Sequence, residues 1–267
     1  MHYFYSGEMP ELLKNSNFEK LTDFLQEQPT VTLRQLKTVF PEKNFERFLD
    51  QMIQLGFVRR EDRRYSLDFP IYEEKIPSGE ILGLQEERLE TADLVRICYE
   101  VIETLKLRTY FFALTDKQRL PMYFEAGNQI RFYSVLYQRN SCALPVYFTN
   151  NREGRTGENP LELQQLIGDV NEEYFFDQVE VILERSNKQR KIRESIFLKA
   201  LLETQILQEE TNQVRVPVIS SEKESFGLEL DSIPTFRLFC LLDYLMNKLG
   251  QESLTFLIKD EKEEKSH

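Results

Sequence analysis

Apolar residues in the N-terminal part of the chain recur at spacings of three and four, the period of an amphipathic helix. This spacing predicts helices over residues 18–28, 33–40 and 45–55. Asn44 is suited to cap the third helix and Gly56 to end it, because each residue type favours that terminal position. The expected apolar stripes comprise Phe18, Leu21, Phe24 and Leu25, then Leu33, Leu36 and Phe40, then Phe45, Phe48, Leu49, Met52 and Ile53.

Two short runs that follow Gly56 have the character of strands. Residues 57–61 and 64–67 are predicted to form a hairpin with a tight polar turn at Asp62 and Arg63. Helix, short strand, helix, turn, helix and hairpin is the element order of a winged helix-turn-helix.

The residues around this hairpin carry a family resemblance. With Leu55, Gly56 and Phe57 leading into the wing and Arg64 and Tyr65 on its return strand, the segment resembles the winged-helix superfamily. It is also similar, over residues 18–70, to an uncharacterised family of small domains from low-GC Gram-positive bacteria. That family shares a V-x-L-R opening and a K/R-R-Y-S-L return strand, here Val31, Leu33, Arg34 and Arg63, Arg64, Tyr65, Ser66, Leu67. The narrower resemblance implies a fold and no activity.

The rest of the chain predicts a larger α+β domain with an antiparallel sheet and amphipathic helices. Residues 68–83 hold two prolines, two glycines and a charge cluster, which is typical of a connector. The sequence therefore predicts a winged-helix domain with its connector over 1–80, an α+β domain over 81–258 and a charged tail over 259–267.

Within this second domain the period of the pattern changes several times. The residues from Asn171 onward favour a helix, although Val179, Val181 and Leu183 also alternate as in a strand. The other expected helices are 84–107, 160–167, 188–207 and 234–249. The expected strands are four in the aromatic-rich residues 108–149, with a hairpin at Gly127 and Asn128, followed by 214–220, 226–230 and 254–258.

Charge is distributed unevenly along the chain. The formal net charge is −11, yet residues 1–67 are neutral, with 10 Lys and Arg against 10 Asp and Glu. The remaining residues carry 24 basic against 35 acidic side chains, so this part of the chain repels a nucleic-acid duplex. Any DNA contact must therefore be local and made by a few arginines.

Several classes of chemistry are absent from the sequence. The two histidines, His2 and His267, stand at the ends of the chain, which argues against histidine-dependent catalysis and most zinc sites. There is no dinucleotide fingerprint, P-loop, paired-cysteine motif or nucleophile elbow. We therefore expect no enzyme, catalytic residue, metal or cofactor. A carboxylate-dependent hydrolase is the remaining enzymatic alternative, with Glu73-Glu74-Lys75 and Glu125 as its few candidates.

The candidate DNA contacts lie on the third helix and the hairpin. Arg47, Gln51 and Gln54 are suited to base edges. Glu46 and Asp50 lie on the same helix face, and their negative charges would repel the phosphates of DNA. The phosphate contacts are predicted at Arg59, Arg60, Arg63 and Arg64.

Two hypotheses for function stay open at this point. In one, the N-terminal part binds double-stranded DNA and the second domain serves for dimerisation or ligand sensing, as in many two-part regulators. In the other, the chain is a protein-interaction or scaffold module, in which the same surface packs against a protein partner or against the acidic second domain. The partners left open are thus DNA, another protein or a second copy of the chain. A further basic cluster at 185–193 and a loop with Arg152 and Arg155 are weaker candidates for anion contacts.

The expected surroundings of the protein are cytoplasmic. No apolar run is long enough to span a membrane, and the N-terminus lacks a basic region followed by an apolar one, so we expect no membrane partner. Cys98, Cys142 and Cys240 stand among apolar neighbours, which predicts buried, reduced thiols.

Overall fold

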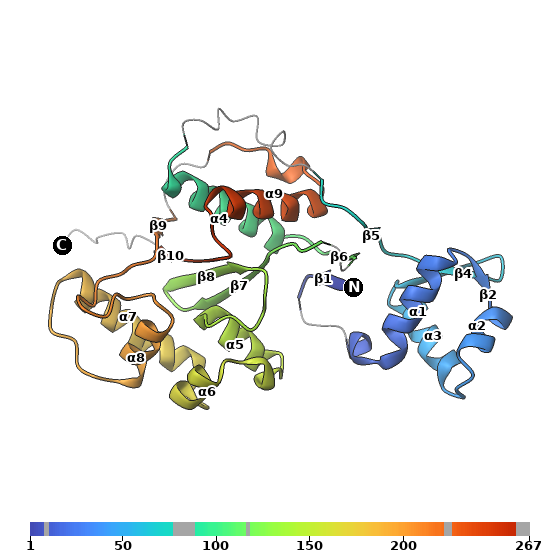
Figure 1. The fold of residues 1–267 in the computed structure, drawn as a ribbon, viewed down its shortest axis with the longest axis horizontal. Helices are drawn as coiled ribbons and strands as arrows, with labels where there is room; N and C mark the ends of the chain where they lie inside the picture. The colour runs from blue at the N-terminus through green and yellow to red at the C-terminus, as the bar shows by residue number, and fades with distance from the viewer. Residues whose placement is uncertain (8–10, 77–88, 116–117, 222–225, 260–267) are drawn as a thin grey trace, which may run out of the picture. The chain divides into compact units, whose positions relative to one another are not determined.

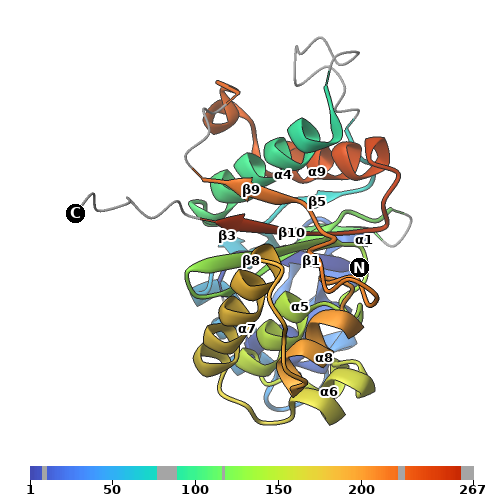
Figure 2. The ribbon, with the colours of Figure 1, turned by 90° about the vertical axis from the view of Figure 1, so that its left-hand side faces the viewer.

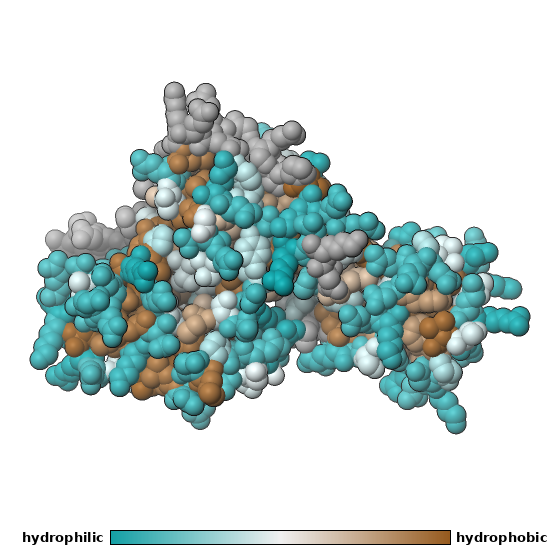
Figure 3. Space-filling view, viewed as in Figure 1, coloured by the Kyte–Doolittle hydropathy of each residue, from teal (hydrophilic) through white to brown (hydrophobic). Residues whose placement is uncertain are grey.

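The computed structural model describes residues 1–7, 11–76, 89–115, 118–221 and 226–259. Within this part the protein has a mixed α+β fold with three small sheets (Figure 1). Polar side chains cover much of the surface that faces the viewer in Figure 3. No helix among the described residues is long and apolar enough to cross a membrane.

The chain forms two compact units. Unit 1 comprises residues 1–75 and 108–119, and unit 2 comprises 76–107 and 120–267. The chain thus leaves unit 1 for a first segment of unit 2, returns to unit 1 for one strand, and then completes unit 2.

Unit 1 contains the predicted N-terminal helices and hairpin. Strands β2, β4 and β3 form one sheet in that order, and strands β1, β6 and β5 form a second sheet. In the second sheet β6 pairs antiparallel with β1 and parallel with β5. The elements are β1 (His2–Tyr5), η1 (Glu11–Lys14), α1 (Ser16–Glu27), β2 (Val31–Thr32), α2 (Leu33–Val39), α3 (Phe45–Gln54), β3 (Val58–Glu61), β4 (Arg64–Leu67), β5 (Ile71–Tyr72) and β6 (Phe111–Leu114).

Helix boundaries in unit 1 follow from capping side chains. The Asn15 side chain accepts a hydrogen bond from the backbone N–H of Asn17 at the start of α1. Thr32 and Gln35 form a reciprocal capping box at the start of α2. Asn44 precedes α3 as expected, but its side chain makes no capping hydrogen bond because its own backbone is already helical, with φ −91° and ψ −1°.

Backbone geometry also fixes the passage from α3 into the hairpin. Gly56 has φ +75°, and the N–H groups of Gly56 and Phe57 bond back to Ile53 and Met52, as in a Schellman ending. Asp62 and Arg63 both have positive φ, at +47° and +61°, which is the geometry of a two-residue type I′ turn. The predicted hairpin and its turn are confirmed.

Unit 2 is built around the mixed sheet β7-β8-β10-β9, in which only β9 and β10 are parallel. Helices α4 and α9 cover one face of the sheet, and α5 to α8 lie on the other (Figure 2). The elements are α4 (Thr91–Lys106), β7 (Met122–Gly127), β8 (Ile130–Leu136), α5 (Leu144–Arg152), η3 (Thr156–Glu158), α6 (Leu161–Ile167), α7 (Glu172–Asn187), α8 (Ile196–Glu203), β9 (Val218–Ser220), η4 (Leu230–Ser232), α9 (Thr235–Lys248) and β10 (Ser253–Lys259).

Part of the prediction for residues 108–149 is wrong. The first of the four expected strands, β6, joins the sheet of unit 1. The last run, from Cys142 onward, forms helix α5, with Pro145 in its first turn. Proline suits this position, where its missing N–H has no helical partner to lose. The hairpin at Gly127 and Asn128 is confirmed as the β7–β8 connection.

Other element boundaries also differ from the prediction. Helix α7 starts after Asn171, so the helical alternative is correct there. Residues 188–195, which were expected to be helical, are not. Helix α7 ends at Asn187, Gln189 has a positive φ of +49°, and the side chain of Ser195 caps a shorter α8. The expected strand at 214–220 is reduced to β9. Residues 226–230 form no strand, and Leu230 instead begins the 3-10 turn η4.

The helix predicted over 84–107 corresponds to α4, and residues 84–88 lie outside the described part. Cys98 and Cys240 are buried as expected, but Cys142 is exposed. The apolar neighbours of Cys142 in the sequence enter helix α5, so they turn towards the core without covering the thiol.

Candidate nucleic-acid interface

Helix α3 is divided into an apolar face and a polar face. The apolar face packs into the core of unit 1 and comprises Phe45, Phe48, Leu49 and Met52, each less than 5% exposed. This spacing leaves Arg47, Gln51 and Gln54 exposed on the opposite face. The three side chains predicted to contact base edges therefore share one solvent-facing side of the helix.

The acidic residues on this helix differ in their pairing. Glu46 Oε1 lies 2.5 Å from Nζ of Lys37 in α2, so its charge is neutralised within the unit. Asp50 is exposed and forms no recorded ion pair with a described residue. Of the two acidic side chains that would repel a phosphate backbone, only Asp50 thus keeps an uncompensated charge.

The hairpin after α3 also has two faces. Alternation and register place Val58, Arg60 and Tyr65 on one face. Val58 and Tyr65 are buried against the unit 1 core, while the Arg60 guanidinium carbon lies 5.6 Å from the centre of the Tyr65 ring. This cation–π contact orients Arg60 while leaving its N–H groups in solvent.

Arg59 is engaged within the hairpin region. One of its guanidinium nitrogens lies 2.5 Å from an Asp68 carboxylate oxygen, and the other lies 3.7 Å from Glu61. The hydrogen bond to Asp68 and the charges of Asp68 and Glu61 raise the pKa of Arg59. A phosphate must compete with both carboxylates for this side chain.

Three predicted phosphate contacts carry charge that the unit does not neutralise. Arg60, Arg63 and Arg64 are exposed, and none forms a recorded ion pair with the described residues. Arg63 stands in the turn itself. The hairpin therefore presents three uncompensated guanidinium groups, one from β3, one from the turn and one from the start of β4.

Two exposed cations near this surface are missing from the sequence prediction. Arg34 lies in α2, two residues before buried Leu36, and Lys43 lies just before α3. The helical period around Leu36 could have identified Arg34 as solvent-facing. Lys43 stands in a short turn whose orientation the periodicity does not define.

The chain was compared with known proteins at three levels. Residues 2–105 match the family model described as domain of unknown function DUF1803. No curated protein and no solved structure gives a significant match. The DUF1803 match includes α3 and the β3–β4 hairpin, which agrees with the predicted resemblance to an uncharacterised family. It ends before β6 and before the sheet of unit 2.

A polar cluster surrounds Tyr133 in β8, a strand that lies beyond the DUF1803 match. Its hydroxyl is within hydrogen-bond distance of carboxylate oxygens of Glu125 (2.8 Å) and Glu103 (2.9 Å). Lys106 Nζ lies 2.5 Å from Glu125 and 2.9 Å from Glu103. Arg131 donates to the Tyr133 hydroxyl at 3.2 Å. Glu125, the carboxylate singled out from the sequence, is therefore engaged by groups of the same unit.

The two arginines of the loop after α5, which were weaker candidates for anion contacts, are also paired. Arg152 lies 2.6 Å from Glu172, and Arg155 lies 3.5 Å from Glu153 and from Glu158. Among the described residues, no group of three His, Cys, Asp or Glu side chains is arranged to hold a metal ion.

The Tyr133 cluster predicts a pH-dependent contribution to stability. Burial lowers the pKa of Lys106, but the bonds to Glu125 and Glu103 outweigh it, so the net shift is upward. Burial and the same two carboxylates raise the pKa of Tyr133. The protonated forms of Lys106 and Tyr133 therefore stabilise the folded protein at any pH below their unfolded-state pKa of about 10. This contribution to the unfolding free energy is lost as the pH rises through the raised folded-state pKa values of the two groups.

Lys106→Met is expected to lower the unfolding free energy by about 1–2 kcal/mol at neutral pH, less than for a fully buried pair because the side chain is partly exposed. The difference from wild type should shrink above about pH 10.5, where the unfolded chain loses the lysine charge, and should disappear as the pH passes the raised pKa of Lys106 in the folded protein. Urea unfolding followed by circular dichroism at pH 7 and above pH 10 measures both values. Lys259→Met, at an exposed position, is the control. A difference that does not change with pH would contradict the role of the lysine charge.

Proposed function

We propose that residues 16–67 form a winged helix-turn-helix that binds double-stranded DNA through α3 and the β3–β4 hairpin. The element order α1, β2, α2, α3, β3, β4 and the three-stranded sheet β2-β4-β3 support this fold. In such domains the last helix enters the major groove and the hairpin lies along the phosphate backbone.

The observation that carries the proposal is the unpaired charge at the hairpin. Arg60, Arg63 and Arg64 are exposed and are not neutralised by carboxylates of the described residues, whereas Arg59 is. Guanidinium groups left in solvent along a hairpin and its turn are well placed for phosphate oxygens.

The polar face of α3 would supply sequence readout. Arg47 offers two parallel N–H groups that match guanine, and the amides of Gln51 and Gln54 match adenine in the major groove. Asp50 disfavours a close approach of phosphate and restricts the helix to orientations that keep it away from the backbone. We assign Arg60, Arg63 and Arg64 to the phosphates. Arg59 is the weakest of the four predicted contacts, because Asp68 and Glu61 compete with phosphate for its guanidinium group.

We further propose that the protein is a DNA-binding regulator and not an enzyme, with unit 2 serving for dimerisation or ligand sensing. The net charge of unit 2 is negative, so unit 1 alone offers a surface that DNA would tolerate. Free cysteines at Cys98, Cys142 and Cys240 fit a reducing compartment, which supports a cytoplasmic location.

Neutralising the three unpaired arginines tests the proposal. The variant Arg60→Gln, Arg63→Gln, Arg64→Gln is expected to bind a mixed-sequence fluorescent duplex about 30- to 100-fold more weakly than wild type at low salt, because three phosphate contacts are lost. Fluorescence anisotropy of the full chain measures this affinity.

The matched control removes the same net charge elsewhere. Lys20→Gln, Arg119→Gln, Arg237→Gln replaces three exposed cations outside α3 and the hairpin, and should retain binding within about threefold. Equal weakening in both variants would mean that net charge alone governs binding, which would contradict a specific role for the hairpin.

A protein partner for the same surface is the second candidate. Val39 and Leu55, at the ends of α2 and α3, are 48% and 58% exposed, and apolar side chains at helix ends favour a protein contact over a phosphate backbone. Val39→Ser, Leu55→Ser discriminates the two functions. DNA binding should be unchanged by this variant, whereas capture of a protein partner would be lost.

A further inference from the structure

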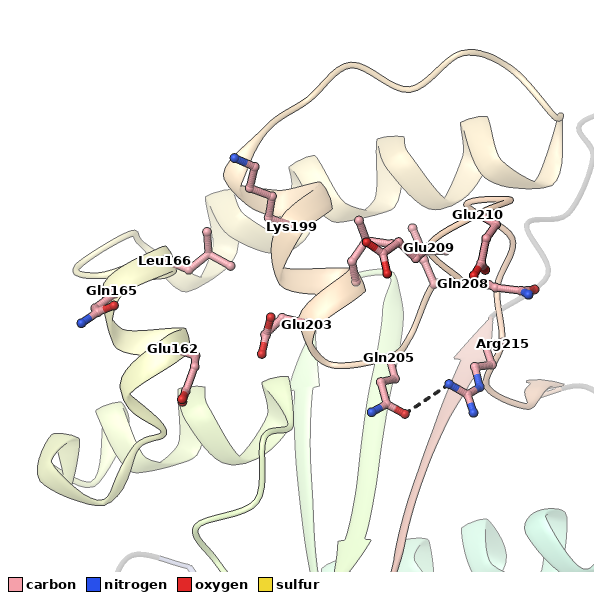
Figure 4. A pocket seen from close by; sticks show the side chains of 12 residues that line it. Glu162, Gln165, Leu166, Lys199, Glu203, Gln205, Gln208, Glu209, Glu210 and Arg215 are labelled. Carbon is pink, nitrogen blue, oxygen red and sulfur yellow. Dashed lines mark hydrogen bonds between the residues drawn. The ribbon is translucent and has the colours of Figure 1, made fainter.

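Unit 2 contains an acidic groove between α6, α8 and the residues that follow α8, with a volume of about 1100 Å³ (Figure 4). Leu166, Leu202 and Leu207 contribute apolar surface to it. Figure 4 shows Glu162 and Glu203 on α6 and α8, and Glu209 and Glu210 on the loop beyond α8. The carboxylates that line the groove are Glu162, Glu203, Glu209 and Glu210.

These four carboxylates are not neutralised within the chain. None of them forms a recorded ion pair with a described residue, although Lys199 and Arg215 also line the groove. Arg215 instead donates to the Gln205 side chain at 3.2 Å. The thiol of Cys142 is affected by the same negative charge. Partial burial of the sulfur and then the charges of Glu203 and Glu162 raise its pKa to about 11. The groove therefore keeps a net negative charge that favours a cationic occupant.

A complementary basic segment lies in the same unit, at residues 190–193 between α7 and α8. Arg190, Lys191 and Arg193 are exposed and form no recorded ion pair with the described residues. The intervening Ile192 packs against the core of unit 2. The backbone is held at its start, where the N–H of Arg190 bonds to the Arg185 carbonyl at 2.8 Å. Three cations are thus displayed outward from an anchored stretch without helix or strand.

We propose that unit 2 forms a two-fold dimer in which the basic segment of each copy docks into the acidic groove of the other. The segment and the groove are joined by α8, a helix of eight residues that spans about 12 Å. Despite this proximity they form no recorded ion pair with each other in one chain. With a two-fold axis close to α8, the basic segment of each copy contacts the acidic groove of the other at the same time. The dimer then contains two equivalent contacts and leaves neither patch free to bind a third copy.

The apolar surface of the groove strengthens this assignment. Leu166 and Leu202 are partly exposed, and they can bury the hydrocarbon stems of arginine and lysine side chains while the carboxylates pair with their heads. The inference rests on the dimerisation role proposed for unit 2 and specifies the surfaces that carry it. It does not depend on DNA binding by unit 1, because its test measures molecular mass and the test of DNA binding measures affinity for a duplex.

Charge reversal on each side of the contact provides the test. Sedimentation velocity of the full chain at low salt should give twice the chain mass of 31.8 kDa. The groove variant Glu203→Lys, Glu209→Lys and the segment variant Arg190→Glu, Arg193→Glu should each raise the dimer dissociation constant by about a hundredfold, because each homodimer then opposes like charges.

Mixing the two variants gives the decisive measurement. In the mixed dimer the lysine-bearing groove meets the glutamate-bearing segment, and the two unaltered patches meet each other, so equal amounts should restore a species of dimer mass. Restoration also shows that both variants are folded. The control Glu229→Lys, Glu252→Lys reverses two exposed acids outside the groove and should remain dimeric.

A wild-type chain that stays monomeric at low salt would overturn the proposal, as would reversed variants that remain dimeric or a mixture that does not associate. If wild type is monomeric but the synthetic peptide Arg-Lys-Ile-Arg binds and protects Cys142 from alkylation, the groove serves a basic segment of another protein, and the dimer is again overturned.

Discussion

Replacing Phe18 with alanine is expected to lower the unfolding free energy of unit 1 by about 3–5 kcal/mol. The ring is 1% exposed and lies in an aromatic cluster, with centroids 5.2 Å from Tyr3, 5.7 Å from Phe57 and 6.4 Å from Phe111. These partners come from β1, the residue before β3, and β6. Removing the ring therefore opens a cavity where three distant segments meet, in a unit whose total stability is of the order of 5–15 kcal/mol.

Hydrogen exchange resolved by peptide mass measures this effect separately for each unit. Peptides from α1 and α3 should exchange faster in Phe18→Ala, and peptides from β8 and β10 should not change. Leu55→Ala, at a side chain that is 58% exposed, is the control and should stay within about 0.5 kcal/mol of wild type. Unchanged protection of α3 in Phe18→Ala would contradict the assignment of this cluster as the core of unit 1.

Gly127→Ala is expected to lower the unfolding free energy of unit 2 by about 2–4 kcal/mol. Gly127 has φ +122°, a conformation that side-chain-bearing residues rarely adopt. An added Cβ would lie 2.3 Å from the Ile130 carbonyl oxygen and 3.2 Å from the Phe132 ring. Because the nearest atom belongs to the backbone of β8, relief requires the β7–β8 hairpin to shift.

Gly157→Ala is the matched control for this variant. Gly157 does not have a positive φ, and nothing lies within 4 Å of an added Cβ. Urea unfolding followed by circular dichroism should therefore separate the two variants by at least about 2 kcal/mol. Equal stability of the two variants would contradict the left-handed turn at Gly127.

The local signals of unit 1 were sufficient to predict its helices and hairpin. Short amphipathic helices with polar caps and a glycine stop are specified by neighbouring residues. The turn at Asp62 and Arg63 is indicated by its position between two strand-like runs, because arginine does not favour the positive φ that Arg63 adopts there.

The errors fall where tertiary contacts override local preference. Strand β6 pairs with β1 more than a hundred residues earlier, a contact that no local window contains. Helix α5 is buried on nearly every side, so the stripe that would distinguish it from a strand is missing. The charged stretch after α7 has no proline or glycine, yet Ser195 caps a separate helix there.

For the candidate interface, exposure could be predicted from the sequence and pairing could not. The helical period shows that Arg47, Gln51 and Gln54 face solvent. It does not show that Asp68 engages Arg59, because that carboxylate lies nine residues away on the far side of the hairpin. The structure alone therefore shows that Arg59 is paired with carboxylates, whereas Arg60, Arg63 and Arg64 form no ion pair with the described residues.

The salt dependence of DNA binding tests the central proposal most directly. With about three phosphate contacts, a plot of log affinity against log salt concentration should have a slope of about −2.7. The affinity of the full chain for a mixed-sequence duplex should therefore fall about fortyfold between about 50 and 200 mM salt. This follows from the three unpaired arginines of the hairpin. No binding at 50 mM salt, or an affinity that does not change with salt, would contradict the assignment of α3 and the hairpin as a DNA-binding surface.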